Sequence, residues 1–560
     1  MPTITIDGKT IEVAEGTMLL PAALESGVHI PHYCWHPKLS VDGNCRMCQV
    51  EIEGAPKLAI ACNTPVRDGM VVHTTSDKVE SARKGVMELL LVNHPLDCPI
   101  CDKAGECLLQ DYSYSYVSNE SKTPEPRRKL EKRKDIGERI FLDQERCILC
   151  RRCVRFCREI TGTSELAVFN LGHTSVLDVL EEKPLDNEYS INVADICPVG
   201  ALTSKDFHHK LRVWFLKKTP SVCPQCSNGC NVTVQHYRDR VWRVMPRRND
   251  AVNDTWICDH GRMTYKRIDA ADRLSLPLVR GELAAAGAGE HGRSGYDHIS
   301  AEDRLRAPRL RDGESLADVG WEPALDTVAQ RLRAAVRDHG ADAVGAIASP
   351  HLSNEESFRF ARLLEALGVE RVALPVPMGD SDDLLIKAEK APNARGARDL
   401  GLGGDAGGPR ALLEAAAAGS IKALYVCGSD ILHVEDADLV ERATAALELL
   451  IVQDLAMSPV AERAHVVLPS LSFAEKDGTF TNVAGRVQRF HKAWDAPEGQ
   501  LSDGEIFSEL LGRVAEAPRG FSAAAVFDEI AASCPAYAGL SYALLGGDGA
   551  VTATGAGGSE

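Results

Sequence analysis

Cysteines at the spacing of metal ligands fill the first half of the chain. Of the 18 cysteines among 560 residues, 16 precede residue 260, and only Cys427 and Cys534 follow. Disulfide frameworks are typical of small secreted chains. This chain is long, and its first residues, "MPTITIDGKTIEV", lack the basic and then apolar pattern of a secretion signal. We therefore expect reduced thiols that bind metal.

Spacing sorts 15 cysteines and one histidine into four groups of four ligands. The groups are Cys34, Cys45, Cys48 and Cys62; His94, Cys98, Cys101 and Cys107; Cys147, Cys150, Cys153 and Cys197; and Cys223, Cys226, Cys230 and Cys258. The first group resembles the plant-type [2Fe–2S] arrangement, with a longer first gap. The third, C-x2-C-x2-C with a remote Cys-Pro, is a ferredoxin signature. Four structural zinc ions are the alternative, because zinc also takes four cysteines or three cysteines and a histidine.

Cys157 competes for a place in the third group. "CILCRRCVRFC" reads as the complete bacterial run, whose fourth cysteine ligates the other cluster of a two-cluster ferredoxin. Here only Cys197-Pro198 remains of a second run, and the other ligands of a second cluster are missing. We therefore predict that Cys197 completes the third group and that Cys157 is not a ligand.

Two kinds of element must position these groups. Residues 3–13 alternate apolar and polar side chains around Asp7-Gly8, which predicts a hairpin with a type I′ turn at the start of a β-grasp domain. Residues 79–92 predict a helix that leads into the second group. From about residue 276, apolar strands at 343–349, 422–428 and 447–454 alternate with helical stretches, which predicts an open parallel α/β sheet.

Charge and hydropathy exclude several classes of function. The net charge of −17 argues against a general nucleic-acid binder. The absence of a run of about 20 apolar residues predicts no membrane span, and we expect a cytoplasmic protein. The basic run 127–134 predicts a solvated connector, with a dock for an acidic partner as the alternative.

Longer motifs resemble one family closely. "HPLDCPICDKAGECLLQD", "CILCRRCVRFCREI" and "ICPVGALTS" resemble the large iron–sulfur subunit of NADH:quinone oxidoreductase, respiratory complex I. "HVVLPSLSFAEKDGTFTNVAGRVQ" (465–488) resembles the molybdopterin-oxidoreductase-like portion of that family, with Asn482, Gly485, Arg486 and Gln488 in the family pattern. The resemblance covers about nine tenths of the chain.

The resemblance implies a multidomain α/β protein. The expected domains are a β-grasp [2Fe–2S] ferredoxin-type domain (1–78), a one-histidine, three-cysteine [4Fe–4S] module (79–122), a linker (123–137), a ferredoxin-like [4Fe–4S] module (138–218), a molybdopterin-oxidoreductase-type [4Fe–4S] domain (219–275), a molybdopterin-oxidoreductase-like α/β domain (276–545) and a disordered tail (546–560).

The function implied by the resemblance is an electron relay through one [2Fe–2S] and three [4Fe–4S] clusters. The implied partners are a flavoprotein subunit that carries NADH and FMN, a small [2Fe–2S] subunit and the hydrophilic subunits at the quinone site. The whole complex translocates protons, and this chain reaches the cytoplasmic face of the membrane only through that complex. It has no substrate-converting active site of its own. In the family the histidine ligates a cluster. A neutral imidazole in place of a thiolate makes that cluster less negative and easier to reduce.

The main alternative is the catalytic subunit of an NAD-linked molybdenum or tungsten formate dehydrogenase. Such enzymes carry two complete ferredoxin runs, a thiolate or selenolate metal ligand, and a lysine where His260 stands here. Only Cys427 and Cys534 could supply the thiolate, and a serine or aspartate ligand is also open. We expect no molybdopterin. Iron-only hydrogenase shares the first three groups, but nothing after residue 260 supplies the cysteines of its active-site cluster.

Overall fold

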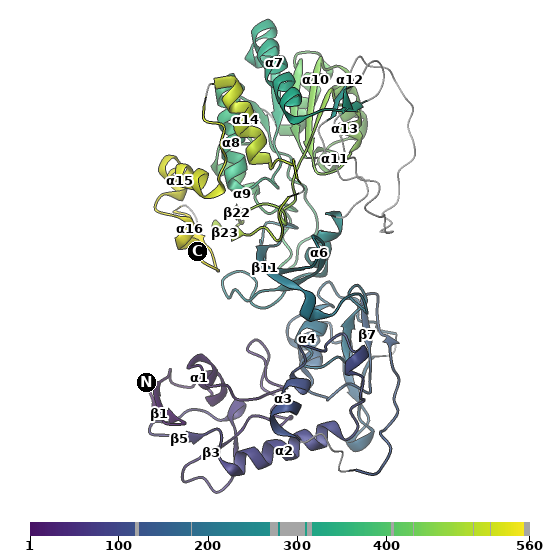
Figure 1. Cartoon of the computed structure of the whole chain (residues 1–560), viewed down its shortest axis with the longest axis vertical. Coiled ribbons are helices and arrows are strands. Elements are labelled where there is room, and N and C mark those ends of the chain that lie inside the picture. The colour runs from purple at the N-terminus through teal and green to yellow at the C-terminus, as the bar shows by residue number, and fades with distance from the viewer. Residues whose placement is uncertain are drawn as a thin grey trace. The chain divides into compact units, whose positions relative to one another are not determined.

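The chain forms two units, Met1–Leu216 and Lys217–Glu560 (Figure 1). The computed structural model describes residues 1–117, 123–180, 182–268, 278–280, 309–310, 316–404, 408–428, 430–496, 498–515 and 517–553. Among these residues, no helix has the length and apolar character needed to cross a membrane.

The first unit opens with the expected β-grasp domain. Its sheet has the order β2-β1-β5-β3-β4, in which β1 and β5 are parallel. The strands are β1 (Thr3–Ile6), β2 (Lys9–Glu12), β3 (Gln49–Ile52), β4 (Ala59–Ile60) and β5 (Val71–His73), and α1 (Leu19–Glu25) packs on them. Asp7 and Gly8 both have positive φ, at 46° and 83°, as a type I′ turn requires. The predicted hairpin is confirmed.

The next segment is helical. α2 (Asp77–Leu91) begins at Ser76, whose side chain accepts a hydrogen bond from Val79 N, and it confirms the helix expected there. A short 3-10 helix, η2 (Cys98–Ile100), and α3 (Leu108–Tyr116) follow.

The basic run after α3 binds acidic groups of its own unit. Lys132 Nζ lies 2.5 Å from Asp97, 3.6 Å from Asp143 and 2.9 Å from Glu145. Lys134, in β6 (Lys134–Asp135), pairs with Asp178 at 2.8 Å. In its described part, the expected solvated linker is therefore wrong, because these two lysines neutralise carboxylates on the ferredoxin-like module and the loop before Cys98.

The ferredoxin-like module has two small sheets. One has the order β10-β7-β6 and the other pairs β8 with β9. Its elements are β7 (Ile140–Leu142), α4 (Arg152–Glu159), β8 (Leu166–Phe169), η3 (Gly172–Thr174), β9 (Val176–Val179), α5 (Asn192–Ile196), β10 (Leu202–Ser204) and η4 (Val213–Phe215).

The second unit begins with an antiparallel three-stranded sheet, β11-β12-β13. Its strands are β11 (Lys217–Val222), β12 (Asn231–His236) and β13 (Val241–Pro246), followed by α6 (Asp259–Met263) and η5 (Thr264–Arg267).

The large sheet of this unit confirms the predicted α/β layer. Its order is β15-β14-β21-β20-β19-β17-β18, with β16 beside β14, and the strands from β21 to β18 are parallel. The strands are β14 (Leu278–Arg280), β15 (Arg309–Leu310), β16 (Leu316–Asp318), β17 (Val344–Ile347), β18 (Arg371–Ala373), β19 (Ala423–Cys427), β20 (Leu449–Asp454) and β21 (Val466–Pro469).

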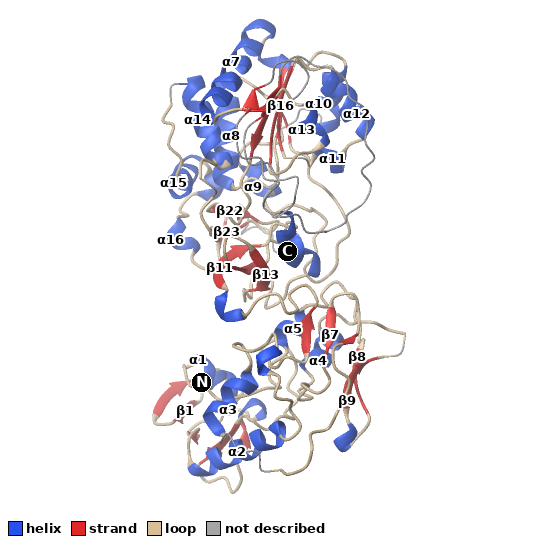
Figure 2. Cartoon of the chain, turned by 45° about the vertical axis from the view of Figure 1, so that its right-hand side comes forward, coloured by secondary structure: helices blue, strands red, loops and turns tan. Residues whose placement is uncertain are grey.

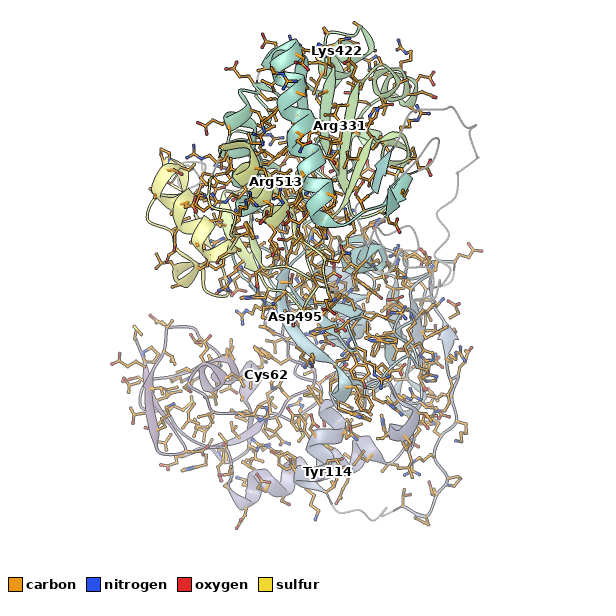
Figure 3. All side chains as sticks on the ribbon, turned by 45° about the horizontal axis from the view of Figure 1, so that its top comes forward. Cys62, Tyr114, Arg331, Lys422, Asp495 and Arg513 are labelled. Carbon is orange, nitrogen blue, oxygen red and sulfur yellow. The ribbon has the colours of Figure 1, made fainter. Side chains whose placement is uncertain are left out.

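Helices cover both faces of the large sheet (Figure 2). One apolar cluster joins the sheet to α7 (Trp321–His339), α8 (Asn354–Leu367) and α14 (Asp503–Ala515). Another joins it to α10 (Gly408–Ala417), α12 (Ala437–Ala445) and α13 (Pro459–Arg463). Arg513 on α14 fastens the first layer by ion pairs with Glu322 and Asp326 on α7 (Figure 3).

The C-terminal residues build a further small sheet. β22 (Gly478–Thr481), β23 (Arg486–Phe490) and β24 (Ala550–Val551) are antiparallel, and α15 (Ala523–Ser533), η8 (Pro535–Tyr537) and α16 (Tyr542–Leu545) lie between β23 and β24 in the chain. The remaining short helices of the unit are α9 (Ala394–Asp399), α11 (Ile431–Val434) and η7 (Ala341–Ala343). Predicted disorder from residue 546 is wrong for 546–553, because β24 pairs with β23 and Thr552 is buried. Residues 554–560 lie outside the described part.

Candidate iron–sulfur sites

The first ligand group lies in the β-grasp domain. Cys34 and Cys45 belong to the long loop before β3, Cys48 precedes that strand, and Cys62 lies in η1 (Ala61–Asn63). The Cys34 sulfur accepts hydrogen bonds from the thiols of Cys45 and Cys62, which lowers the pKa of Cys34. The thiol of Cys48 likewise interacts with that of Cys62. The fold thus brings the four sulfurs of this group together.

The second group surrounds the short turn between α2 and α3. Cys98 begins η2 and Cys107 immediately precedes α3. Cys101 and Cys107 are buried, whereas Cys98 is exposed. Burial raises the pKa of Cys107 to about 11. Burial, assisted by the charge of Arg146, lowers the pKa of His94 to about 4, so this imidazole is neutral, as a ligand must be.

The third group lines one enclosed cavity. Cys147, Cys150, Cys153 and Cys197 form its wall together with apolar side chains such as Val168 and Leu177. Leu149 and Arg151 adopt positive φ, at 51° and 58°, and wrap the C-x2-C-x2-C loop around the cavity. Burial raises the pKa of the Cys153 thiol, and the neighbouring cysteines add to that effect.

Cys157 faces a different neighbour. It lies on α4 outside the residues that line this cavity. Burial raises the pKa of its thiol, and a hydrogen bond to the Glu165 carboxylate adds to the shift. The side chain therefore has a local polar partner.

The fourth group opens the second unit. Cys223 follows β11, Cys230 precedes β12, and Cys258 immediately precedes α6. Each of these sulfurs is buried, as is that of Cys226. Asn228 Nδ2 donates to the Cys230 sulfur at 3.1 Å, and Gly261 N donates to the Cys258 sulfur at 3.3 Å.

The residues fit sulfur-ligated metal centres. Two glycines leave room beside the sulfurs: a Cβ on Gly200 would lie 2.2 Å from the Cys101 sulfur, and a Cβ on Gly261 would lie 2.8 Å from that of Cys223. Buried thiols with raised pKa values lose their protons when a metal ion supplies positive charge. Closed sets of four soft donors suit iron–sulfur clusters or zinc.

Buried arginines on α4 tie the first and third groups together. Arg155 donates to the Cys34 carbonyl and, at 3.4 Å, to the Cys150 carbonyl. Arg152 donates to the carbonyls of Trp35 at 2.5 Å and Ile196 at 3.1 Å. Both arginines therefore hold backbone next to ligands of two groups.

The second and third groups also touch. Leu108 N, next to Cys107, donates to the Pro198 carbonyl, next to Cys197, at 3.0 Å. The charge of Cys197 contributes to the raised pKa of Cys107. The ligand groups of the first unit thus form one connected series.

Five family models match the chain in series. They are the 2Fe-2S iron-sulfur cluster binding domain (1–77), the NADH-ubiquinone oxidoreductase-G iron-sulfur binding region (83–122), the ferredoxin-like domain of NADH-quinone oxidoreductase subunit 3 (137–203), the molybdopterin oxidoreductase Fe4S4 domain (216–270) and molybdopterin oxidoreductase (304–389 and 393–513). The chain belongs to the G-type iron–sulfur subunits of NADH-quinone oxidoreductase and their relatives. The expected multidomain α/β fold is confirmed.

Relatives of this G-type protein differ in how much they share. The G-type NADH-quinone oxidoreductase chain of Rickettsia felis is 38% identical over 66% of the chain, which spans about half (49%) of that relative. The NADPH-Fe(3+) oxidoreductase subunit alpha of Geobacter sulfurreducens is 29% identical over 96% of the chain and 84% of its own length. A crystal structure of an NAD+-reducing [NiFe]-hydrogenase has 30% identity, covers 38% of this chain and 91% of its own, and has a TM-score of 0.34.

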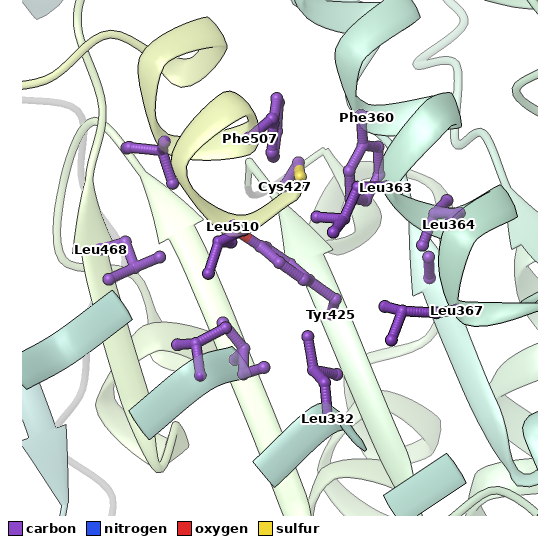
Figure 4. Close-up of a cluster of buried hydrophobic side chains, with 14 of the residues drawn as sticks. Leu332, Phe360, Leu363, Leu364, Leu367, Tyr425, Cys427, Leu468, Phe507 and Leu510 are labelled. Atoms are coloured by element: carbon purple, nitrogen blue, oxygen red, sulfur yellow. The ribbon is translucent and has the colours of Figure 1, made fainter. Parts of the chain in front are cut away.

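The molybdopterin-like domain buries its candidate thiolate. Cys427 ends β19 inside an apolar cluster with Tyr425, Phe360 and Phe507 (Figure 4). Burial raises the pKa of Cys427. The other candidate, Cys534, donates a hydrogen bond to the Asp399 carbonyl at 3.5 Å.

Sequence reasoning missed the arginines of α4. Arg152 and Arg155 are three residues apart and therefore share one face of the helix, alongside Cys153 and Cys157. Their spacing was visible, but their carbonyl acceptors lie more than 100 residues earlier in the chain for Trp35 and Cys34. The signal in the sequence was the burial expected for a helix that carries two cysteines.

Proposed function

We propose that this G-type protein relays electrons in the peripheral arm of an NADH:quinone oxidoreductase. The proposed ligands are the four groups above, with one [2Fe–2S] cluster at Cys34, Cys45, Cys48 and Cys62 and [4Fe–4S] clusters at the other three. Electrons enter from a flavoprotein subunit that oxidises NADH and leave towards quinone, in a complex that translocates protons. The complex also includes a small [2Fe–2S] subunit and quinone-site hydrophilic subunits, through which this chain meets the cytoplasmic face of the membrane.

One observation carries the proposal: the ligand groups of the first unit are linked directly through buried arginines and backbone hydrogen bonds. When bound, iron–sulfur clusters take up and release single electrons. The work of the chain is then to hold them close together, exclude water and tune their potentials through hydrogen bonds and burial. Arg152 and Arg155 fix the first and third sites against each other. Gly200 lets backbone approach the second site.

The second group is proposed to exchange electrons with a partner subunit. Cys98 is the exposed cysteine of that group. Leu96 and Ile100, on either side of it, are 79% and 58% exposed. Exposed apolar side chains around an exposed metal ligand suit a protein interface, because a docked partner buries them and shields the cluster from water.

A specific observation supports a second candidate. The Geobacter NADPH-Fe(3+) oxidoreductase chain covers more of this protein than the Rickettsia relative does. The chain would then relay electrons from a nicotinamide nucleotide to an acceptor other than quinone. Its ligand groups and cluster content would be the same, and its partners would differ.

The decisive experiment has two parts. Low-temperature EPR of the dithionite-reduced protein, with iron and acid-labile sulfide counts, should give 14 irons per chain from 2 + 3 × 4. Affinity purification of the native complex should then recover a flavoprotein and quinone-site subunits with NADH-dependent quinone reduction. Zinc in place of iron contradicts the relay. Iron–sulfur content with NADPH-dependent ferric reduction and no quinone-site subunits favours the second candidate.

A further inference from the structure

Three side chains outside the ligand groups converge beside the second site. Asp102, His208 and His209 each offer a ligand atom, and these atoms all lie within 4.8 Å of one another. Asp102 Oδ2 lies 3.0 Å from His208 Nδ1. The backbone N of His209 donates to both carboxylate oxygens of Asp102, at 3.1 Å each, and so holds that carboxylate towards the histidine pair.

The His208 ring is held by packing while its nitrogens are unused. It stacks on His209 with ring centroids 3.9 Å apart and meets the edge of Phe141 at 5.1 Å. Within the described residues, both of its ring nitrogens are buried and make no hydrogen bond of acceptable geometry, the Asp102 approach included. An unsatisfied buried polar group costs on the order of 1–3 kcal/mol. A ligand that uses these nitrogens removes that cost.

The electrical environment keeps His208 neutral. Burial lowers the pKa of His208, and the charges of Arg133 and Arg146 act in the same direction, against the opposing effect of Asp102. A neutral imidazole has a free lone pair, as metal ligation requires. The nearby arginines disfavour a bound cation as well, so the Asp102 carboxylate supplies the negative charge that offsets them.

We propose that Asp102, His208 and His209 bind one divalent ion of the first transition row, such as Zn²⁺. Two imidazoles and a carboxylate leave one position for water in a four-coordinate site. Zinc–ligand bonds of about 2.0–2.2 Å place tetrahedral donors roughly 3.3 Å apart, so small side-chain movements close the present arrangement. This nitrogen and oxygen set is chemically distinct from the sulfur-rich groups.

The site would clip two segments of the first unit together. Asp102 follows Cys101, a ligand of the second group, and the histidines follow β10 of the ferredoxin-like module. A metal ion there fixes the loop that carries Cys98 and Cys101 to the neighbouring module. The inference does not depend on the proposed relay, because the three donors are not cluster ligands.

The test uses the anaerobically purified, cluster-loaded protein. One equivalent of Zn²⁺ is added, the protein is desalted, and zinc and iron are counted. Zinc K-edge EXAFS then reads the ligands. The variant is His208→Phe, which preserves the aromatic stacking and removes both nitrogens. His209→Gln is a second variant at a more exposed position, and the exposed His173→Phe is the matched control.

We expect about one zinc per chain with only nitrogen and oxygen ligands in the wild type and in His173→Phe. We expect at least a 100-fold weaker zinc affinity in His208→Phe and His209→Gln, with iron content unchanged. Zinc that is absent from the wild type, zinc with sulfur ligands, or zinc kept by both site variants overturns the proposal. Iron counts in the same samples report on the cluster assignment separately.

Discussion

Gln488 donates a hydrogen bond from Nε2 to the carbonyl of Gly229 at 2.9 Å, although 259 residues separate the two. Asn231 donates in turn to Gln488 Oε1. Asn482 donates to the Asn228 carbonyl at 3.1 Å. Two residues of the molybdopterin-like motif therefore hold the loop between Cys226 and Cys230. In this unit, the motif supports the fourth ligand group.

Gln488→Ala should weaken the fourth site selectively. The change leaves the Gly229 carbonyl and the Asn231 amide buried without partners, at about 1–3 kcal/mol each. We expect loss of up to four irons per chain, from the assignment of one [4Fe–4S] cluster to this group, with the EPR signals of the other clusters retained. Val483→Ala, in the same loop with an exposed side chain, is the control. Full iron content in Gln488→Ala would show that the hydrogen bonds do not support the cluster.

Cys157→Ser and Cys197→Ser should separate the two candidate fourth ligands of the third group. Cys197 lines the cavity with Cys147, Cys150 and Cys153, whereas Cys157 bonds Glu165. We expect Cys157→Ser to keep all 14 proposed irons and Cys197→Ser to lose four, by the same ligand assignment. Iron analysis and EPR after anaerobic purification give the answer. The opposite pattern reverses the assignment.

The spacing of cysteines predicted which sulfurs share a site, because most members of each group are close in sequence. The Asp7-Gly8 turn was predictable for the same reason. Arg152 and Arg155 were not assigned, since their acceptors Trp35 and Cys34 belong to another domain. Composition alone suggested a disordered tail. The pairing of Ala550 with Val487 overrides it through contacts that only the folded chain supplies.

His94→Cys should lower the reduction potential of the second cluster by on the order of 100 mV, because a charged thiolate replaces a neutral imidazole. The low pKa of His94, about 4, means that the wild-type ligand is already neutral at pH 7. Redox titration followed by EPR measures the shift. His94→Ala should instead give a labile cluster. An unchanged or raised potential in His94→Cys shows that ligand charge does not set this potential.

Lys476→Met should destabilise the molybdopterin-like domain in a pH-dependent way. Lys476 Nζ lies 2.8 Å from Glu356 and 2.7 Å from Asp503, and all three side chains are buried. Removing the cation leaves two buried carboxylates unpaired, at about 3–5 kcal/mol. Thermal denaturation of the wild type and the variant at pH 5 and pH 8 measures the effect.

The sign of the pH dependence follows from the two carboxylates. Burial raises the pKa of Glu356 above its unfolded value, so its contribution to stability falls as pH rises through the folded pKa. Lys476 holds the pKa of Asp503 below its unfolded value despite burial, so Asp503 contributes stability above the unfolded pKa that is lost in acid. Without Lys476, burial raises both pKa values. The variant should therefore lose more stability at pH 8 than at pH 5, and an equal loss at both rules out this account.

The domain that contains β17–β21 should bind no molybdenum or tungsten. A pterin-bound metal that transfers hydride or oxygen takes a further ligand from the protein, which is a soft thiolate in formate enzymes. The thiol of Cys427 is 2% exposed, and its raised pKa keeps it protonated. Cys534 is hydrogen-bonded to a backbone carbonyl beside α15. Elemental analysis should find neither metal in stoichiometric amount, and formate should not reduce the clusters, whereas dithionite should. About one molybdenum or tungsten per chain, with reduction by formate, would instead identify the protein as a formate dehydrogenase and assign Gln488 and Asn482 to the pterin as well as to the cluster loop.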